Sequence, residues 1–308
     1  MVVRCAARSV DGGTLVGRAQ AVGTCGELVQ GVLASGEHFH VTLPIDWRGE
    51  VALRVRSAPD VTVDGLARGK EKLARALVAT ASLLGTGPVA IEVKSSSTLP
   101  VGRGMGSSTA DVVAGARALA DAVDAVLAPE QLAGIATGIE RSDGTMYDGV
   151  VAFCPRTGQL LRRYPWHPRF AVVMAIPPEQ VRTESVDFTG KVALAPHFEQ
   201  LLADLDEAAV DRDPFAFADA ATRSATLNQP FLVNRLFDEL RQRQARLGAA
   251  GTVIGHTGTV AGLLFPVDEH VADGTAEALG RARFAAEALA PSLTRARLAV
   301  TLTSGRSG

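Results

Sequence analysis

The sequence predicts a mixed α+β fold in two parts, and three features lead to this prediction. Short segments with alternating apolar residues are typical of half-buried strands, and longer segments with an apolar residue every three or four positions are typical of amphipathic helices. The two kinds of segment follow one another without strict strand–helix–strand alternation. Pro165 and Pro168 mark a boundary, which divides the chain into domains 1–165 and 166–308.

The first half contains three predicted strands and three predicted helices. The strands lie at 48–55, 89–93 and 150–153. The helices lie at 68–84, 108–127 and 129–140. Gly85 and Pro88 end the first helix, and Pro129 suits the first turn of the third helix. In the second helix, apolar residues recur at spacings of four, three, four and four, at Val112, Ala116, Leu119, Val123 and Leu127.

The second half repeats this mixture, with four predicted helices. Strands are predicted at 170–176, 262–265 and 296–303. Helices are predicted at 197–208, 214–225, 232–247 and 270–289. The apolar fraction of 47% is sufficient for a packed core over 308 residues.

Composition excludes several functional classes. No run of about 18 apolar residues occurs, and the N-terminus lacks a secretory signal, so we expect a cytoplasmic protein without a membrane partner. Three dispersed cysteines form no CxxC pair, which fits a reducing compartment and gives no structural zinc motif. A net charge of −2 gives no basic surface for nucleic acid.

A glycine-rich loop follows the strand at 89–93 and precedes the helix at 108–127. Its central part reads Pro100-Val-Gly-Arg-Gly-Met-Gly-Ser-Ser108. Three alternating glycines permit a backbone path that is closed to other residues and let a ligand approach closely. The free N–H groups and the positive dipole end of the following helix favour an anion. The two serine hydroxyls can donate to phosphate or bind Mg²⁺, so the segment has the chemistry of a polyphosphate site.

Known phosphate motifs with other spacings do not fit this loop. The GxxxxGK[ST] pattern requires a lysine, and the loop has none. The dinucleotide pattern GxGxxG requires a glycine where Ser107 stands, and no GxSxG hydrolase motif occurs. From the glycines and serines alone, a flexible turn followed by a serine-capped helix is an equally acceptable interpretation.

The loop resembles the phosphate-binding loop of the superfamily of galactokinase, homoserine kinase, mevalonate kinase and phosphomevalonate kinase (GHMP kinases), whose pattern is Pro-x-x-x-Gly-Leu-Gly-Ser-Ser-Ala. Two other segments agree in order. Residues 22–31, VGTCGELVQG, and 255–262, GHTGTVAG, are similar to the first and third motifs of the branch that phosphorylates L-threonine in cobalamin side-chain synthesis and propanediol utilisation.

The chain departs from these patterns at three places. Val22 stands where proline is usual, and Thr24 replaces a lysine found in several members of the superfamily. The segment Glu140-Arg-Ser-Asp-Gly144 differs from Glu-Pro-Thr-Asp-Ser, which is common in the threonine-specific branch. These differences leave the kinase interpretation intact and leave the acceptor open.

The resemblance implies a two-domain fold, with an N-terminal domain like domain 2 of ribosomal protein S5 and a C-terminal α/β sandwich, and an active site in the cleft between them. ATP is expected along the loop, at Pro100, Gly102, Gly104, Met105, Gly106, Ser107 and Ser108. Ser108 and Glu140 are the implied Mg²⁺ ligands, and Asp143 is the implied catalytic carboxylate. Acceptor binding is implied for Glu27, Gln30, His256, Thr257 and Gly258.

Ordinary structural roles exist for both acidic residues of the second segment. A glutamate near a helix end is commonly solvated, and an aspartate before glycine commonly forms a turn. Asp148, which also precedes a glycine, is an alternative base. Phosphoryl transfer depends chiefly on positioning and electrostatics, so Asp143 either removes the acceptor proton or only orients the hydroxyl.

The sequence thus predicts an ATP- and Mg²⁺-dependent kinase whose partner is a small hydroxyl amino acid, first of all L-threonine. Homoserine or another amino-alcohol of a specialised pathway is the alternative acceptor. A nucleotide-binding sensor without catalytic activity is the third hypothesis, and it requires Glu140 and Asp143 to be dispensable.

Overall fold

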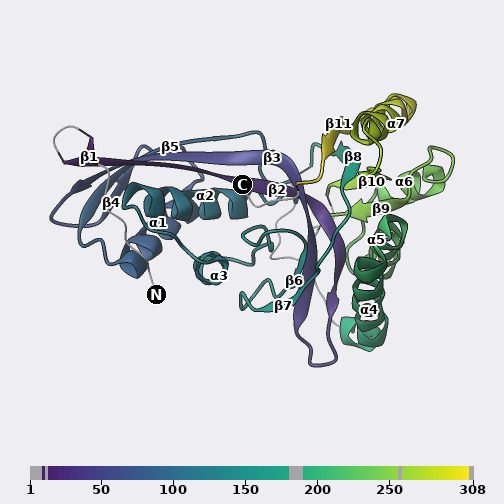
Figure 1. Ribbon diagram of the computed structural model, residues 1–308, viewed down its shortest axis with the longest axis horizontal. Helices are drawn as coiled ribbons and strands as arrows, with labels where there is room; N and C mark the ends of the chain where they lie inside the picture. Colours follow the sequence, from purple (N-terminus) through teal and green to yellow (C-terminus); the bar gives the residue numbers. More distant parts are fainter. Residues whose placement is uncertain (1–8, 11–12, 180–189, 256–258, 305–308) are drawn as a thin grey trace.

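The computed structural model describes residues 9–10, 13–179, 190–255 and 259–304. These residues form one sheet of eleven strands with the main order β11-β8-β10-β9-β2-β3-β5-β4, and they confirm the α+β class (Figure 1). The strands are β1 (Ser9–Val10), β2 (Thr14–Val32), β3 (His38–Ser57), β4 (Thr62–Asp64), β5 (Val89–Ser97), β6 (Val151–Phe153), β7 (Leu160–Arg163), β8 (Phe170–Ile176), β9 (Gly251–Ile254), β10 (Ala261–Pro266) and β11 (Arg297–Leu302). The helices are α1 (Glu71–Leu84), α2 (Ser107–Ala122), α3 (Pro129–Thr137), α4 (Ala195–Asp211), α5 (Pro214–Asn228), α6 (Phe237–Arg243) and α7 (Gly274–Leu289), with a 3-10 turn η2 (Lys191–Leu194).

Two long antiparallel strands, β2 and β3, connect the halves of the molecule. Their register runs from Leu15 opposite Val55 to Val32 opposite His38. Figure 1 shows the pair extending from the β5 side of the sheet past the β9 side. The register shifts three times between Val22 and Val29, within the segment identified as the first motif. Such bulges bend a strand and redirect its side chains, so the motif occupies the irregular part of β2.

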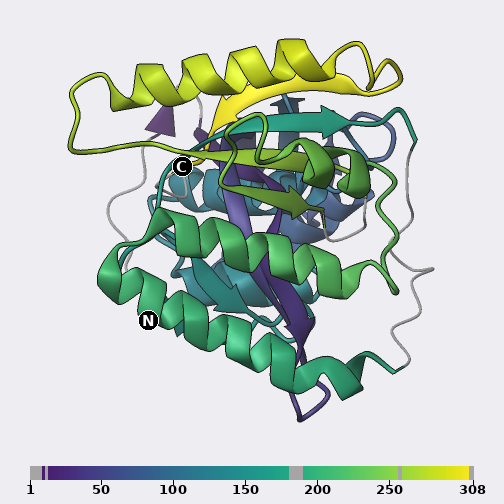
Figure 2. The same cartoon turned by 90° about the vertical axis from the view of Figure 1, so that its right-hand side faces the viewer.

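Helices cover the two halves of the sheet separately. α2 packs on β2 and β3, and α1 and α3 pack on α2. In the other half, α5 packs on β2 and β9, α4 packs on α5, and α7 packs on β8, β10 and β11. Figure 2 shows this second group of helices from the outside. The glycine-rich loop joins β5 to α2 and therefore belongs to the first half.

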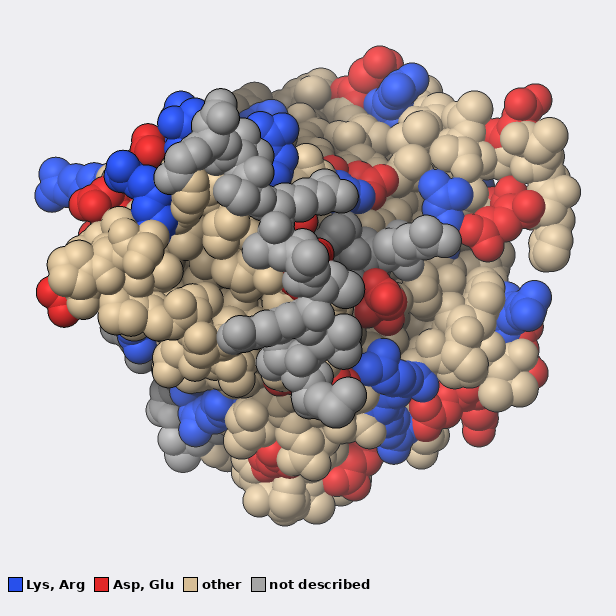
Figure 3. Space-filling view, turned by 60° about the vertical axis from the view of Figure 1, so that its left-hand side comes forward, with Lys and Arg blue, Asp and Glu red and all other residues tan. Residues whose placement is uncertain are grey.

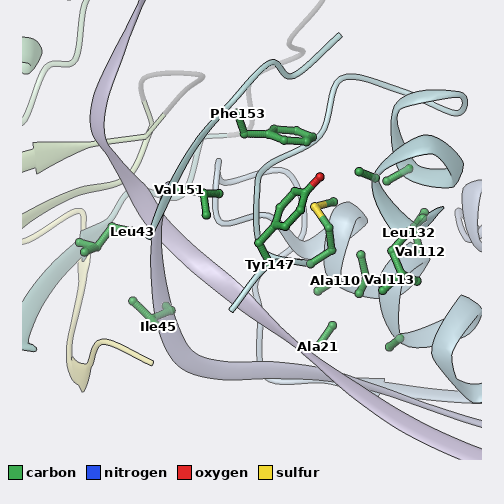
Figure 4. Close-up of a cluster of buried hydrophobic side chains, with 14 of the residues drawn as sticks. Ala21, Leu43, Ile45, Ala110, Val112, Val113, Leu132, Tyr147, Val151 and Phe153 are labelled. Atoms are coloured by element: carbon green, nitrogen blue, oxygen red, sulfur yellow. The ribbon is translucent and has the colours of Figure 1, made fainter. Parts of the chain in front are cut away.

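A buried aromatic pair holds the chain that follows Asp143. Tyr147 and Phe153 are at most 1% exposed, and their ring centroids are 5.9 Å apart (Figure 4). Val113 and Leu132, from α2 and α3, belong to the same cluster. Burying an aromatic side chain of this size contributes about 1.5–3 kcal/mol. The position of Asp143 is therefore fixed by core packing directly after it.

Most predicted helices are present, but three end earlier than predicted. The second predicted helix ends at Ala122, not at residue 127, because Asp124 adopts a positive φ of 53°. The third ends at Thr137, so Glu140 lies in the following turn. The segment predicted as a helix over 232–247 is helical only from Phe237 to Arg243. The division at residue 165 stays a prediction.

Candidate active site

The glycine-rich loop adopts the backbone conformation for which its glycines were singled out. Gly102, Gly104 and Gly106 have φ values of 70°, 74° and 66°. These values lie in the left-handed region, which side chains with a Cβ rarely adopt. Gly106 is the residue before α2, so the free N–H groups of that helix begin directly after the loop. The arrangement agrees with the predicted anion site, to which Pro100 and Ser107 also contribute backbone.

Contacts from both halves of the molecule hold the loop. The backbone N–H of Thr24, in the first motif, donates to the Met105 carbonyl at 3.0 Å. The Thr259 hydroxyl donates to the Arg103 carbonyl, and the Arg103 guanidinium donates to the Pro178 carbonyl. The Arg103 guanidinium therefore points to Pro178 and has a hydrogen-bond partner within the chain. The Met105 side chain is buried in the core, so this residue presents only its backbone to a nucleotide.

Ser108, Glu140 and Lys72 form a polar cluster at the start of α2. The Ser108 hydroxyl donates to one Glu140 carboxylate oxygen, and the Lys72 ammonium pairs with the other. Their side chains come from α2, from the turn after α3 and from the start of α1. A carboxylate beside a hydroxyl offers the oxygen ligands that Mg²⁺ prefers. The two predicted Mg²⁺ ligands, Ser108 and Glu140, are thus adjacent. Lys72, which was not predicted, forms an ion pair with the Glu140 carboxylate.

Asp143 lies against the loop and the first turn of α2. The Thr109 hydroxyl is 3.4 Å from Asp143 Oδ2, and a Cβ on Gly106 would stand 2.9 Å from the same oxygen. The N–H of Gly144 donates to the Thr42 hydroxyl at 3.2 Å. Burial, and then the nearby Glu140 carboxylate, raise the pKa of Asp143 to about 6. A carboxyl with this pKa is mostly ionised at neutral pH and still accepts a proton readily.

Glu27 stands beside Asp143 on the irregular part of β2. Its side chain is 2% exposed, and the Thr42 hydroxyl and the Asp143 carboxylate interact with its carboxyl group. Burial, followed by the charge of Asp143, raises the pKa of Glu27 well above its usual range. One ligand atom each from Glu27, His40 and Asp143 lies within 4.8 Å of the other two. The site therefore contains two neighbouring carboxyl groups and an imidazole.

The other residues predicted to bind the acceptor substrate are Gln30 and residues 256–258. Gln30 is buried opposite His40, and its backbone bonds to Ser224 and Asn228 of α5. His256, Thr257 and Gly258 lie outside the described residues. The residues on either side of them reach the loop: Thr259 as above, and Gly255, where a Cβ would stand 3.3 Å from the Gly104 carbonyl oxygen. Asp148, the alternative base, is exposed.

Sequence reasoning missed Lys72, Thr109 and the role of His40. Lys72 is one of only four lysines in the chain, which was a signal for a functional cation. His40 is not among the residues that the sequence predicts for the site. Its proximity to Glu27 and Asp143 depends on the pairing of β2 with β3 and has no signal in the local sequence.

Among the described residues, no helix has the length and apolar character needed to cross a bilayer. On the face shown in Figure 3, basic and acidic side chains are interspersed. This distribution agrees with the net charge of −2.

Comparison with known sequences adds independent observations. Residues 71–154 match the family model described as the GHMP kinases N terminal domain. An L-threonine kinase of Citrobacter freundii is 27% identical over 83% of this chain and 88% of its own length. An L-threonine kinase of Salmonella typhimurium is 28% identical over 84% of this chain and 86% of its own length.

Solved structures with the same fold include kinases with different acceptors. L. major mevalonate kinase in complex with R-mevalonate aligns with a TM-score of 0.66 and 16% identity over 99% of both chains. Homoserine kinase from Cytophaga hutchinsonii aligns with a TM-score of 0.68 and 16% identity over 97% of both chains. At these identities the likeness concerns the fold.

Proposed function

We propose that this chain, which belongs to the GHMP kinase superfamily and is an ATP-dependent phosphotransferase with an alcohol acceptor, phosphorylates the hydroxyl of a small amino acid. The first candidate acceptor is L-threonine, and the products would be O-phospho-L-threonine and ADP. The observation that supports this proposal is the meeting of loop, Mg²⁺ ligands and Asp143 at the start of α2. The two L-threonine kinases, similar over more than four fifths of this chain, support the acceptor. Cobalamin side-chain synthesis or salvage is the proposed setting.

The residues present fit a magnesium nucleotide. Gly102, Gly104 and Gly106 leave a cradle without side chains, and α2 directs its free N–H groups toward it. Ser108 and Glu140 would hold Mg²⁺, which neutralises phosphate charge when it is bound. Lys72, beside the same carboxylate, would then face the phosphates with its ammonium group. These features form the nucleotide half of the proposed site.

Asp143 is the proposed catalytic residue. Its carboxylate lies beside Gly106, at the end of the loop where a transferred phosphoryl group is expected. With a pKa of about 6 it is ionised at neutral pH, so it can orient the acceptor hydroxyl and accept its proton. Thr109 and the anchored turn at Gly144 keep the carboxylate in place. Positioned general bases of this kind contribute typically 10²–10⁴-fold to the rate.

Glu27 and Gln30 are proposed to line the acceptor side of the site. Both are buried on β2, and Glu27 adjoins Asp143. A buried carboxylate next to the reacting hydroxyl favours a positively charged acceptor, which agrees with an amino acid. Residues 256–258 are included in this proposal through the third motif.

Homoserine, or another amino-alcohol, is the second candidate acceptor. The departures from the threonine-specific branch at Val22 and at Arg141-Ser142 favour it, since residues next to the motifs face the acceptor. A sensor without catalysis is disfavoured, because Glu140 and Asp143 both adjoin the loop.

The test is to incubate the protein with ATP, Mg²⁺ and a panel of hydroxyl amino acids, following ADP release and product mass. We expect threonine-dependent ADP and the mass of phosphothreonine. A higher kcat/KM for homoserine than for threonine would support the kinase assignment and change the proposed acceptor to homoserine. ATP binding without turnover on any alcohol, unchanged by Asp143→Ala, would favour the sensor.

A further inference from the structure

Three hydrogen-bond acceptors from distant parts of the chain surround one point next to the loop. Glu27 comes from β2, His40 from β3 and Asp143 from the turn after α3, and one atom of each lies within 4.8 Å of the others. Glu27 is 98% buried, and the Thr42 hydroxyl and the Asp143 carboxylate interact with its carboxyl group. Two buried carboxyl groups side by side are costly to ionise unless a cation lies between them.

Several acidic groups gather at this point and favour a cation. Glu27 and Asp143 are adjacent carboxyl groups, and Glu140 acts on Asp143 as a third. Lys72 pairs with Glu140 and so already neutralises that carboxylate. The first motif, residues 22–31, contains neither lysine nor arginine. The pair Glu27–Asp143 thus has two acidic groups and no lysine from the first motif.

We infer that Glu27, His40 and Asp143 bind the primary ammonium group of the acceptor, and that this ammonium site selects alcohols with an amine on the carbon next to the hydroxyl. The inference rests on the proposed function for the identity of the phosphoryl acceptor. A primary ammonium has three N–H donors, which matches three acceptors. Acceptors about 2.8 Å from one tetrahedral nitrogen lie about 4.6 Å from one another, a spacing within the observed limit.

The position of Asp143 sets the relation between amine and hydroxyl. One of its oxygens would accept from the ammonium group, and the other would face the hydroxyl beside the loop. Because both substrate groups contact one carboxylate, a nitrogen and an oxygen on adjacent carbons fit with the fewest rotatable bonds to order. Threonine and serine have this arrangement, whereas homoserine has one more carbon between the two groups. The ammonium site therefore favours the first candidate acceptor over the second.

Acceptor binding should also change the ionisation of the site. Burial raises the pKa values of both Glu27 and Asp143. The charge of Asp143 adds to this effect on Glu27, and the charge of Glu140 adds to it on Asp143, so an ammonium group between the two residues offsets these causes in part. Protons bound at about pH 6 are then released when the acceptor binds. An acceptor without an amine does not cause this release.

Isothermal titration calorimetry at about pH 6, in two buffers with different ionisation enthalpies, measures both affinity and proton release. The ligands are L-threonine, 3-hydroxybutyrate, which lacks the amine, and N-acetyl-L-threonine, in which the amine is blocked. We expect threonine to bind with proton release and the other two to bind at least about tenfold more weakly. Glu27→Gln should weaken threonine binding by a similar factor and leave 3-hydroxybutyrate binding unchanged.

Glu92→Gln is the matched control, because Glu92 is exposed on β5. It should bind threonine like the unmodified protein. Retained binding of a non-hydrolysable ATP analogue shows that Glu27→Gln is folded. Equal affinity for threonine and N-acetyl-L-threonine overturns the ammonium site even if phosphothreonine is formed. If threonine binding depends on Glu27 but no phosphoryl transfer occurs, the ammonium site is supported and the proposed function is contradicted.

A metal ion is the competing occupant. The inference is overturned if Mn²⁺ binds without nucleotide, competes with threonine, and no longer binds to Glu27→Gln or His40→Ala. Such a result would assign the three residues to a metal ion. Mn²⁺ binding that requires nucleotide and depends on Glu140 alone supports it, because the metal then occupies the other cluster.

Discussion

Asp143 Oδ2 lies 2.9 Å from the point where a Cβ on Gly106 would stand. The carboxylate and the last glycine of the glycine-rich loop are thus in direct contact, although 36 residues lie between them in the sequence. The contact leaves no room for a larger residue at position 106. It links the nucleotide half of the proposed site to the acceptor half.

Gly106→Ala should abolish most activity for two separate reasons. The residue has a φ of 66°, which alanine adopts only with strain, and the added methyl group displaces the Asp143 carboxylate. We expect a loss of at least about tenfold in kcat together with weaker ATP binding, measured by steady-state kinetics. Gly36→Ala is the control, since Gly36 has a φ of 83° but open space around it. Equal losses in the two variants would show that backbone strain alone is responsible.

Asp143→Asn should lower kcat by about 10²–10⁴-fold, because an amide cannot accept the hydroxyl proton. The same change should stabilise the ligand-free protein at pH 7, since it removes a buried charge next to Glu27 and Glu140. Thermal unfolding and single-turnover kinetics measure the two effects. A variant with normal kcat would reduce the role of Asp143 to packing.

The raised pKa of Asp143 gives a pH dependence of known sign. The folded-state value of about 6 exceeds the ordinary 3.8, so the folded protein binds more protons than the unfolded chain between these values. The contribution of this group to stability is therefore present at low pH and is lost as pH rises through about 6, by up to about 3 kcal/mol in total.

Activity should depend on pH in the opposite direction. The ionised carboxylate is the active form, so kcat/KM for the acceptor should fall as pH decreases below about 6. Steady-state kinetics between about pH 5 and 8 measure this limb. A kcat/KM that is flat down to pH 5 would mean that the residue is not titrated in the free enzyme.

Glu140 and Lys72 should affect the magnesium requirement in opposite directions. Glu140→Gln removes a charged ligand and should raise the Mg²⁺ concentration for half-maximal activity by about tenfold or more. Lys72→Met removes the ammonium group that competes for the same carboxylate, so this concentration should fall. Lys94→Met, at an exposed position on β5, should change nothing. A higher magnesium requirement in Lys72→Met would contradict the competition.

Thr259→Val should weaken nucleotide binding without abolishing phosphoryl transfer. Its hydroxyl donates to the Arg103 carbonyl and so connects the third motif to the loop. Loss of one such hydrogen bond costs about 0.5–1.5 kcal/mol, which corresponds to about a 2- to 13-fold rise in KM for ATP. Thr226→Val is the control, because that hydroxyl donates to a carbonyl within α5. An unchanged KM for ATP would show that this bond does not position the loop.

The elements that the sequence predicted well are those with local causes. The three glycines were expected at a loop before a helix, and they have positive φ values directly before α2. The strand predicted at 170–176 has the same bounds in the structure, where all seven of its apolar residues are buried. Backbone sterics and apolar periodicity depend on neighbouring residues, so a single sequence contains them.

Only the tertiary structure decided which side chains meet. The pairing of β2 with β3, together with the bulges between Val22 and Val29, places Glu27 beside Asp143 and His40. The packing of α1 on α2 carries Lys72 to Glu140. These contacts join residues far apart in the chain, and their register depends on the whole sheet and core. The sequence by itself therefore determined the glycine-rich loop before α2 and indicated the class of reaction. The charges around Asp143 were decided by long-range packing, because no local pattern encodes the distance between two strands.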